Sequence, residues 1–178
     1  MSPRDCRPTL MRAITMLRTP AFSVLLLVPL ELLFAHLQKT VRFDANRVSL
    51  TGYSMGGYGT WAWAAAFPQH FAAIAPHAGG LGHGGPKDVT GDLDGWATRL
   101  AALPIRIVHG ADDEVVPAER SARMLEALES HGARQAELIL LPGKAHNIGD
   151  SFANKGLYAW LLKHARAADT AVDGKPAP

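Results

Sequence analysis

Short apolar runs alternate with longer stretches of helical period along most of the chain. Each run has the length of a buried strand and leads into a turn rich in Gly, Pro or Asp. We predict strands over residues 47–50, 105–109 and 137–141, and a further apolar run over 71–75 that is bounded by Pro76. Between and after them we predict helices over residues 57–67, 117–131 and 151–166.

This alternation indicates the fold class. Strands separated by helices of about 10–15 residues are typical of parallel βαβ units, whose helices cover the faces of the sheet. We therefore expect an α/β three-layer sandwich with a mostly parallel sheet over residues 21–166. Residues 1–20 lack periodicity and are expected to be poorly ordered, and residues 167–178 are expected to be a disordered tail.

The apolar stretch at residues 21–37 admits two interpretations. Four arginines precede it, as in a signal peptide or membrane anchor. However, Pro29, Glu31 and His36 interrupt it well short of the ~20 apolar residues that a membrane span needs. We therefore favour a buried strand over residues 23–28 and a helix over 30–39, with a cytoplasmic location. Secretion is the alternative.

Composition and charge exclude several classes of protein. With 48% hydrophobic and 19% charged residues, the 178-residue chain is ordinary globular material. A net charge of +2 without a Lys/Arg cluster gives no reason to expect nucleic acid. Cys6 is the only cysteine, which excludes an internal disulfide and a zinc site built from cysteines.

The strongest chemical signal is Gly52-Tyr53-Ser54-Met55-Gly56, a Gly-x-Ser-x-Gly motif between a predicted strand and a predicted helix. Such a turn raises the serine hydroxyl clear of the sheet, and side chains at Gly52 and Gly56 would collide within it. Ser54 is thus the candidate nucleophile. The Met55 N–H, at the start of the helix, is the candidate oxyanion donor.

A serine nucleophile needs a base and an acid that orients the base, and in this architecture they follow in the order Ser, Asp/Glu, His. His146 lies in the loop after the last predicted strand and is the candidate base. Asp112, Asp113 and Glu114 follow the strand at 105–109. Position on the loop alone does not separate Asp112 from Asp113.

Other polar positions have weaker claims. Tyr53 and His77 are the candidate substrate contacts; His77 and His83 belong to a Gly-rich stretch that we expect to be a loop. His109, at the end of a strand, is expected to be packed and hydrogen-bonded. Residues 80–85 satisfy Gly-x-Gly-x-x-Gly, but no convincing helix follows to hold a pyrophosphate, so we expect a loop over the active site instead.

The stretch Asp-Ala-Asn-Arg-Val-Ser-Leu-Thr-Gly-Tyr-Ser-Met-Gly-Gly-Tyr-Gly-Thr-Trp at residues 44–61 resembles a particular group of α/β-hydrolases. The group contains prolyl-oligopeptidase-like peptidases, polyhydroxybutyrate-depolymerase-like esterases and dienelactone-hydrolase-like enzymes. His-Gly-Ala-Asp-Asp-Glu-Val-Val-Pro and Pro-Gly-Lys-Ala-His extend the resemblance. It implies Asp113 as the acid, hydrolysis of an ester or less often a peptide, and neither metal nor organic cofactor.

The chain departs from that group before the motif. Only 53 residues precede Ser54, and residues 1–40 contain no His-Gly-Gly-Gly-like run to supply a second oxyanion donor. The N-terminal strands are therefore expected to be reduced, and the strand before Ser54 is expected either to gain residues 23–28 as its neighbour or to form an exposed edge that permits self-association.

The function that we expect is a serine carboxylesterase acting on a small-molecule or polymeric ester through an acyl-enzyme. A serine peptidase and a non-catalytic binding module are the alternatives.

Overall fold

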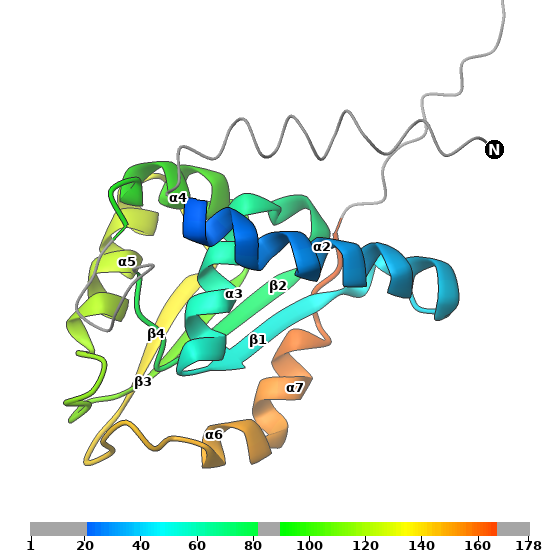
Figure 1. Cartoon of the computed structure of the whole chain (residues 1–178). Helices are drawn as coiled ribbons and strands as arrows, with labels where there is room; N and C mark the ends of the chain where they lie inside the picture. Colours follow the sequence, from blue (N-terminus) through cyan, green and yellow to red (C-terminus); the bar gives the residue numbers. More distant parts are fainter. Residues whose placement is uncertain (1–20, 82–89, 167–178) are drawn as a thin grey trace, which may run out of the picture.

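Four parallel strands form the centre of the fold, in the order β1-β2-β3-β4 (Figure 1). The structure is a computed structural model and describes residues 21–81 and 90–166. Every neighbouring pair in the sheet is parallel. The carboxyl ends of all four strands therefore meet at one edge, where the loops that follow them gather. The strands are β1 (Ser49–Tyr53), β2 (Ala73–His77), β3 (Ile105–Gly110) and β4 (Ala136–Leu141).

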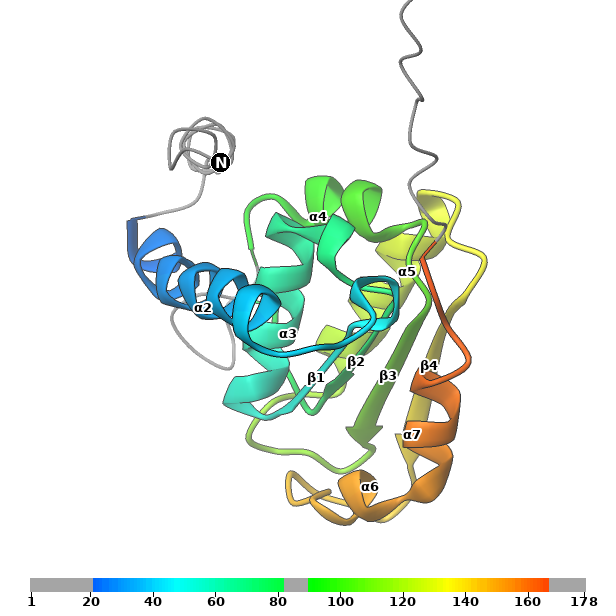
Figure 2. The same cartoon turned by 90° about the vertical axis from the view of Figure 1, so that its right-hand side faces the viewer.

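Helices cover both faces of this sheet (Figure 2). On one face lie α3 (Met55–Ala66), α4 (Leu93–Leu100) and α5 (Glu119–Ser130). On the other face lies α7 (Lys155–Leu161), preceded by the single turn α6 (Asp150–Ala153). Short 3-10 helices occupy Ala45–Arg47 and Pro68–His70. The expected three-layer α/β arrangement with a parallel sheet is confirmed.

The alternation of side chains along β2 shows how the two cores arise. Successive residues of a strand point to opposite faces. Ile74 enters the larger core with α3, α4 and α5, where Trp61, Leu100 and Leu128 are also fully buried. Its neighbours Ala73 and Ala75 instead contact α7. Small alanines on that face let a short helix lie close to the sheet.

The strands predicted at 105–109 and 137–141 are confirmed with shifts of one residue. The end of β2 was predicted too early, because the strand continues through Pro76 to His77. Proline has no N–H, so it costs the sheet one hydrogen bond without ending the strand.

The helix predicted over 151–166 is also wrong as a single element. Asn154 takes an extended conformation and its side chain caps the N–H of Gly156, which starts a new helix.

The strand predicted over residues 23–28 is wrong. Helix α2 (Ala21–Thr40) occupies this stretch, with Pro29 inside it. Leucine is a strong helix former, and the run holds more leucines than β-branched residues. Leu27 and Phe34 are buried two turns apart, and Glu31 between them accepts a hydrogen bond from Trp63 Nε1 and contacts His70 Nε2 at 3.0 Å. The helix thus docks on α3 with one face.

Helix α4 was not predicted. Its sequence carries the signal, because Leu93, Trp96, Ala97 and Leu100 follow helical spacing and the last three are buried. The predicted terminal segments, 1–20 and 167–178, and most of the predicted loop at 80–85 lie outside the described residues. Across residues 21–81 and 90–166, the helices are too short or too polar to cross a membrane.

In the described part of the chain β1 pairs only with β2 and so forms an edge of the sheet. The Ser54 N–H donates to the His77 carbonyl, so the alternation of the backbone turns the N–H and C=O groups of Ser49, Thr51 and Tyr53 to the outer side. An apolar groove of about 300 Å³ runs beside this edge. Its lining includes Phe34 and Leu37 of α2, Phe43, and Leu50 of β1.

We predict that this edge promotes self-association, because an edge strand offers a template for pairing with another chain. Ser49→Pro removes an outward N–H at the first residue of the strand, where proline is tolerated, and should lower the weight-average mass measured by light scattering over a concentration series. The wild-type chain remaining a monomer at every concentration would contradict the prediction.

Candidate active site

Ser54 stands on the turn that joins β1 to α3. Its backbone has φ 53° and ψ −114°, a conformation rare for a residue with a side chain. A Cβ on Gly52 would lie 2.2 Å from the Gly56 carbonyl oxygen, so the motif needs glycine there. The matching expectation for Gly56 is wrong, since a Cβ at that position would meet open space.

The structure brings Ser54, His146 and Asp113 together. Ser54 Oγ lies 2.8 Å from His146 Nε2, and His146 Nδ1 lies 2.8 Å from Asp113 Oδ2. The His146 side chain is 20% exposed, whereas the Asp113 side chain is fully buried. The three groups thus form a continuous hydrogen-bonded series whose outer end, at Ser54, is open to solvent in part.

Asp113 is held by its own loop. Its Oδ1 accepts hydrogen bonds from the N–H groups of Val115 at 2.9 Å and Val116 at 2.8 Å. This leaves Oδ2 for the imidazole. The adjacent Asp112 is exposed to solvent. The structure therefore separates the two carboxylates that their position along the loop could not separate.

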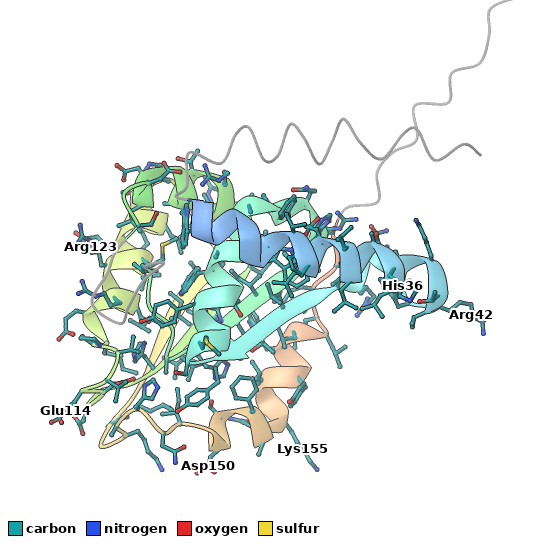
Figure 3. The ribbon with its side chains drawn as sticks, in the orientation of Figure 1. His36, Arg42, Glu114, Arg123, Asp150 and Lys155 are labelled. Atoms are coloured by element: carbon teal, nitrogen blue, oxygen red, sulfur yellow. The ribbon has the colours of Figure 1, made fainter. Side chains whose placement is uncertain are left out.

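The loops that carry Asp113 and His146 contact each other through the backbone. The Asp112 N–H donates to the Lys144 carbonyl at 2.9 Å, and the Ala111 N–H donates to the Leu141 carbonyl at 3.0 Å. A Cβ on Gly110 would lie 2.2 Å from the Ala145 carbonyl oxygen. In Figure 3, Glu114 marks the first loop and Asp150 marks the segment after His146, both at the lower side of the molecule.

The remaining predicted site residues have different surroundings. Met55 opens α3, and the first N–H groups of a helix have no partner within it, so its N–H is suited to an oxyanion. The Tyr53 hydroxyl donates to the His146 carbonyl at 2.8 Å and so holds the backbone of His146 directly. Whether Tyr53 also contacts substrate stays a prediction.

His77 does not lie in a loop, as the sequence suggested, but ends β2 as a fully buried residue. Its Nδ1 lies 2.7 Å from Ser151 Oγ and its ring lies 4.5 Å from that of Phe152. Burial lowers the pKa of His77 from 6.5 to about 4. These contacts join β2 to α6. Its predicted contact with substrate remains untested, and His83 lies outside the described residues.

His109 is buried and hydrogen-bonded, as predicted, but its position beside Asp113 was not foreseen. Its Nε2 lies 3.2 Å from Asp113 Oδ2. The signal in the sequence was the spacing of four residues between them at the end of a strand. Among residues 21–81 and 90–166, there is no group of three or more His, Cys, Asp or Glu side chains arranged to hold a metal ion.

The sheet, its helical layers and the loops at its carboxyl edge define an α/β-hydrolase fold. The chain belongs to the dienelactone hydrolase family, whose model matches residues 4–171. Beyond this family match, similarity to individual proteins covers the chain only in part.

A protein of Escherichia coli strain K12 named "Putative carboxymethylenebutenolidase" is 33% identical over 109 residues, which cover 58% of this chain and 37% of that protein. A thermostable esterase of known structure has a TM-score of 0.67 and 29% identity over 79% of this chain and 37% of its own. A Klebsiella pneumoniae structure titled a putative dienelactone hydrolase has a TM-score of 0.53 and 27% identity over 67% and 48% of the two chains. The chain thus spans about 37% of the curated relatives that it matches.

We predict that Gly110→Ala pushes the two loops apart. The added methyl meets backbone that has no flexible side chain to yield, so unfolding free energy should fall by about 1–3 kcal/mol. Gly59→Ala is the matched control, because a Cβ there meets nothing within 4 Å inside α3, and it should be neutral or stabilise by up to about 1 kcal/mol. Urea titrations of both variants measure the difference, and equal stability of the two would refute the close contact.

We also predict that His77 makes stability depend on pH. Its pKa is lower when folded than when unfolded, so this contribution is complete above pH 6.5 and is lost as pH falls toward 4. The loss should reach as much as about 3 kcal/mol. In His77→Gln the decline in unfolding free energy between these pH values should shrink, whereas the exposed His36→Gln should keep it. An unchanged profile in His77→Gln would contradict the prediction.

Proposed function

We propose that this chain is a serine hydrolase that cleaves carboxylic esters through an acyl-enzyme on Ser54. The observation that carries the proposal is the series Ser54–His146–Asp113, joined by two contacts of 2.8 Å. A nucleophile in contact with a base, and a base in contact with a buried acid, is the arrangement that activates a serine hydroxyl. Membership of the dienelactone hydrolase family supports hydrolysis of esters.

Each residue then has one role. Ser54 Oγ attacks the ester carbonyl while His146 Nε2 takes its proton, and the carbonyl oxygen becomes an oxyanion that the Met55 N–H stabilises. The tetrahedral intermediate expels the alcohol, which receives the proton from His146. Water, deprotonated by His146, then attacks the acyl-enzyme. The second tetrahedral intermediate breaks its bond to Ser54 Oγ, which receives the proton from His146 as the carboxylic acid is released.

Asp113 acts on the base and not on the substrate. Accepting from Nδ1–H, it leaves Nε2 free to take the Ser54 proton and stabilises the imidazolium that forms. Its complete burial strengthens this electrostatic contact, and the Val115 and Val116 N–H groups keep its other oxygen occupied.

The relatives and the site support the proposed substrate class. The E. coli relative is named for a carboxymethylenebutenolidase activity, and the structural neighbour is an esterase. Ser54 and His146 are partly exposed, so small esters reach them. We propose a small or polymeric carboxylic ester as substrate.

Labelling with a fluorophosphonate tests the nucleophile. Wild-type chain should be labelled and should hydrolyse p-nitrophenyl esters, and Ser54→Ala should lose both while keeping its circular dichroism spectrum. Ser130→Ala, in an exposed serine at the end of α5, is the matched control and should behave as wild type. Labelling that persists in Ser54→Ala would refute the assignment.

The two neighbouring aspartates provide the test of the acid. Asp113→Asn keeps the shape but favours the wrong tautomer of His146, so kcat should fall by roughly 10³–10⁴-fold. Asp112→Asn, at an exposed position, should change kcat less than about threefold. The opposite ranking would show that Asp112 is the acid.

A further inference from the structure

We propose that His109 is a positioning residue for Asp113, so that the polar contacts of the active site extend inward by one more histidine and a serine. The inference rests on the proposed function for its effect on catalysis. It rests on geometry alone for its effect on the Asp113–His146 contact.

The surroundings of His109 require a hydrogen on Nε2. That nitrogen lies 2.9 Å from the Val116 carbonyl oxygen and 3.2 Å from Asp113 Oδ2. A carbonyl and a carboxylate only accept hydrogen bonds, so an unprotonated Nε2 would face two acceptors in a site closed to water. The Nε2–H therefore donates to Val116 and places its positive end beside the carboxylate.

Ser121 contacts His109 on the other side of the ring. Its Oγ lies 2.7 Å from His109 Nδ1, and both residues are fully buried. The Ser121 hydroxyl and His109 Nδ1 are within hydrogen-bond distance, and a hydroxyl can serve as partner to a ring nitrogen with or without its hydrogen. Since Ser121 belongs to α5 and His109 to β3, the pair also fixes the ring relative to two rigid elements.

His109 reaches Asp113 by two routes. The direct one is the contact of 3.2 Å to Oδ2, the oxygen that also receives the His146 Nδ1–H. The indirect one passes through Val116, whose carbonyl accepts from His109 while its N–H donates to Asp113 Oδ1. Both routes keep the plane of the carboxylate turned toward His146.

A second buried histidine shows that burial alone does not require this arrangement. His77 also lies 2.7 Å from a serine hydroxyl, that of Ser151, yet its Nε2 is buried without a hydrogen-bond partner in the described structure. The contacts of His109 Nε2 with the Val116 carbonyl and Asp113 are therefore a feature of its position beside Asp113, and burial alone does not explain them.

The proposal is tested first without turnover. An imidazole N–H that donates to a buried carboxylate gives a proton resonance far downfield, and the His146 signal is identified by its loss in Asp113→Ala. His109→Met removes the donor at similar size and should shift or broaden that signal. His109→Gln, whose amide N–H can reach the same place, should restore it. Ile105→Ala, at a buried position on the same strand, should leave it unchanged even though stability falls.

Kinetics test the consequence for catalysis. His109→Met should lower kcat by about 10- to 100-fold with little change in KM. A displaced His146 slows the chemical step but hardly affects the binding of substrate. His109→Gln should recover most of the loss. In an Asp113→Asn background His109→Met should have almost no further effect on kcat, because His109 acts through Asp113.

The outcomes separate the two proposals. Fluorophosphonate labelling that persists in Ser54→Ala refutes the proposed function. The His146 N–H resonance then still tests the role of His109. A His146 resonance that His109→Met does not move, or a kcat loss of the same size in the Asp113→Asn background, would overturn the inference.

Discussion

The loop after β3 and the loop after β4 are joined backbone to backbone, and the geometry of the site depends on that junction. Gly110 comes so close to the chain at Ala145 that no side chain fits, and the Asp112 N–H donates to Lys144. Asp113 and His146 occupy these two loops, next to the junction. The distance of 2.8 Å between Asp113 Oδ2 and His146 Nδ1 is therefore set by main-chain contacts between the two loops.

Backbone geometry at the ends of the strands also places Ser54 and His109. Ser54 sits where β1 turns into α3 in a backbone conformation that Gly52 permits. His109 sits one residue before Gly110, where its ring faces the start of α5 and the Asp113 carboxylate. The strands thus place these side chains at the carboxyl edge of the sheet, and the short loops that follow orient them.

The sequence predicted those elements and residues that have strong local signals. The Gly-x-Ser-x-Gly turn, the strand before Gly110 and the loop around His146 each have a composition that few other structures would use. Choosing Asp113 over Asp112 depended on a family resemblance, because loop position is the same for both and only burial separates them. His77 was misplaced because Gly79 and Gly80 next to it suggested a loop, whereas β2 continues through Pro76.

Residues 23–28 form part of a helix instead of the predicted strand for a different reason. A short apolar run has no period that separates a strand from a buried helix, and the choice depends on which neighbours it finds. Here Trp63 of α3 contacts Glu31 and Phe34, and these contacts hold the run as a helix packed on α3. The outer side of β1 then stays without a partner strand in the described part of the chain.

The most direct test is a crystal structure of the chain after reaction with a fluorophosphonate. We expect phosphorus bonded to Ser54 Oγ, the phosphoryl oxygen within hydrogen-bond distance of the Met55 N–H, and His146 still in contact with Asp113. Phosphorus on another residue, or on Ser54 with its oxygen turned away from Met55, would contradict it.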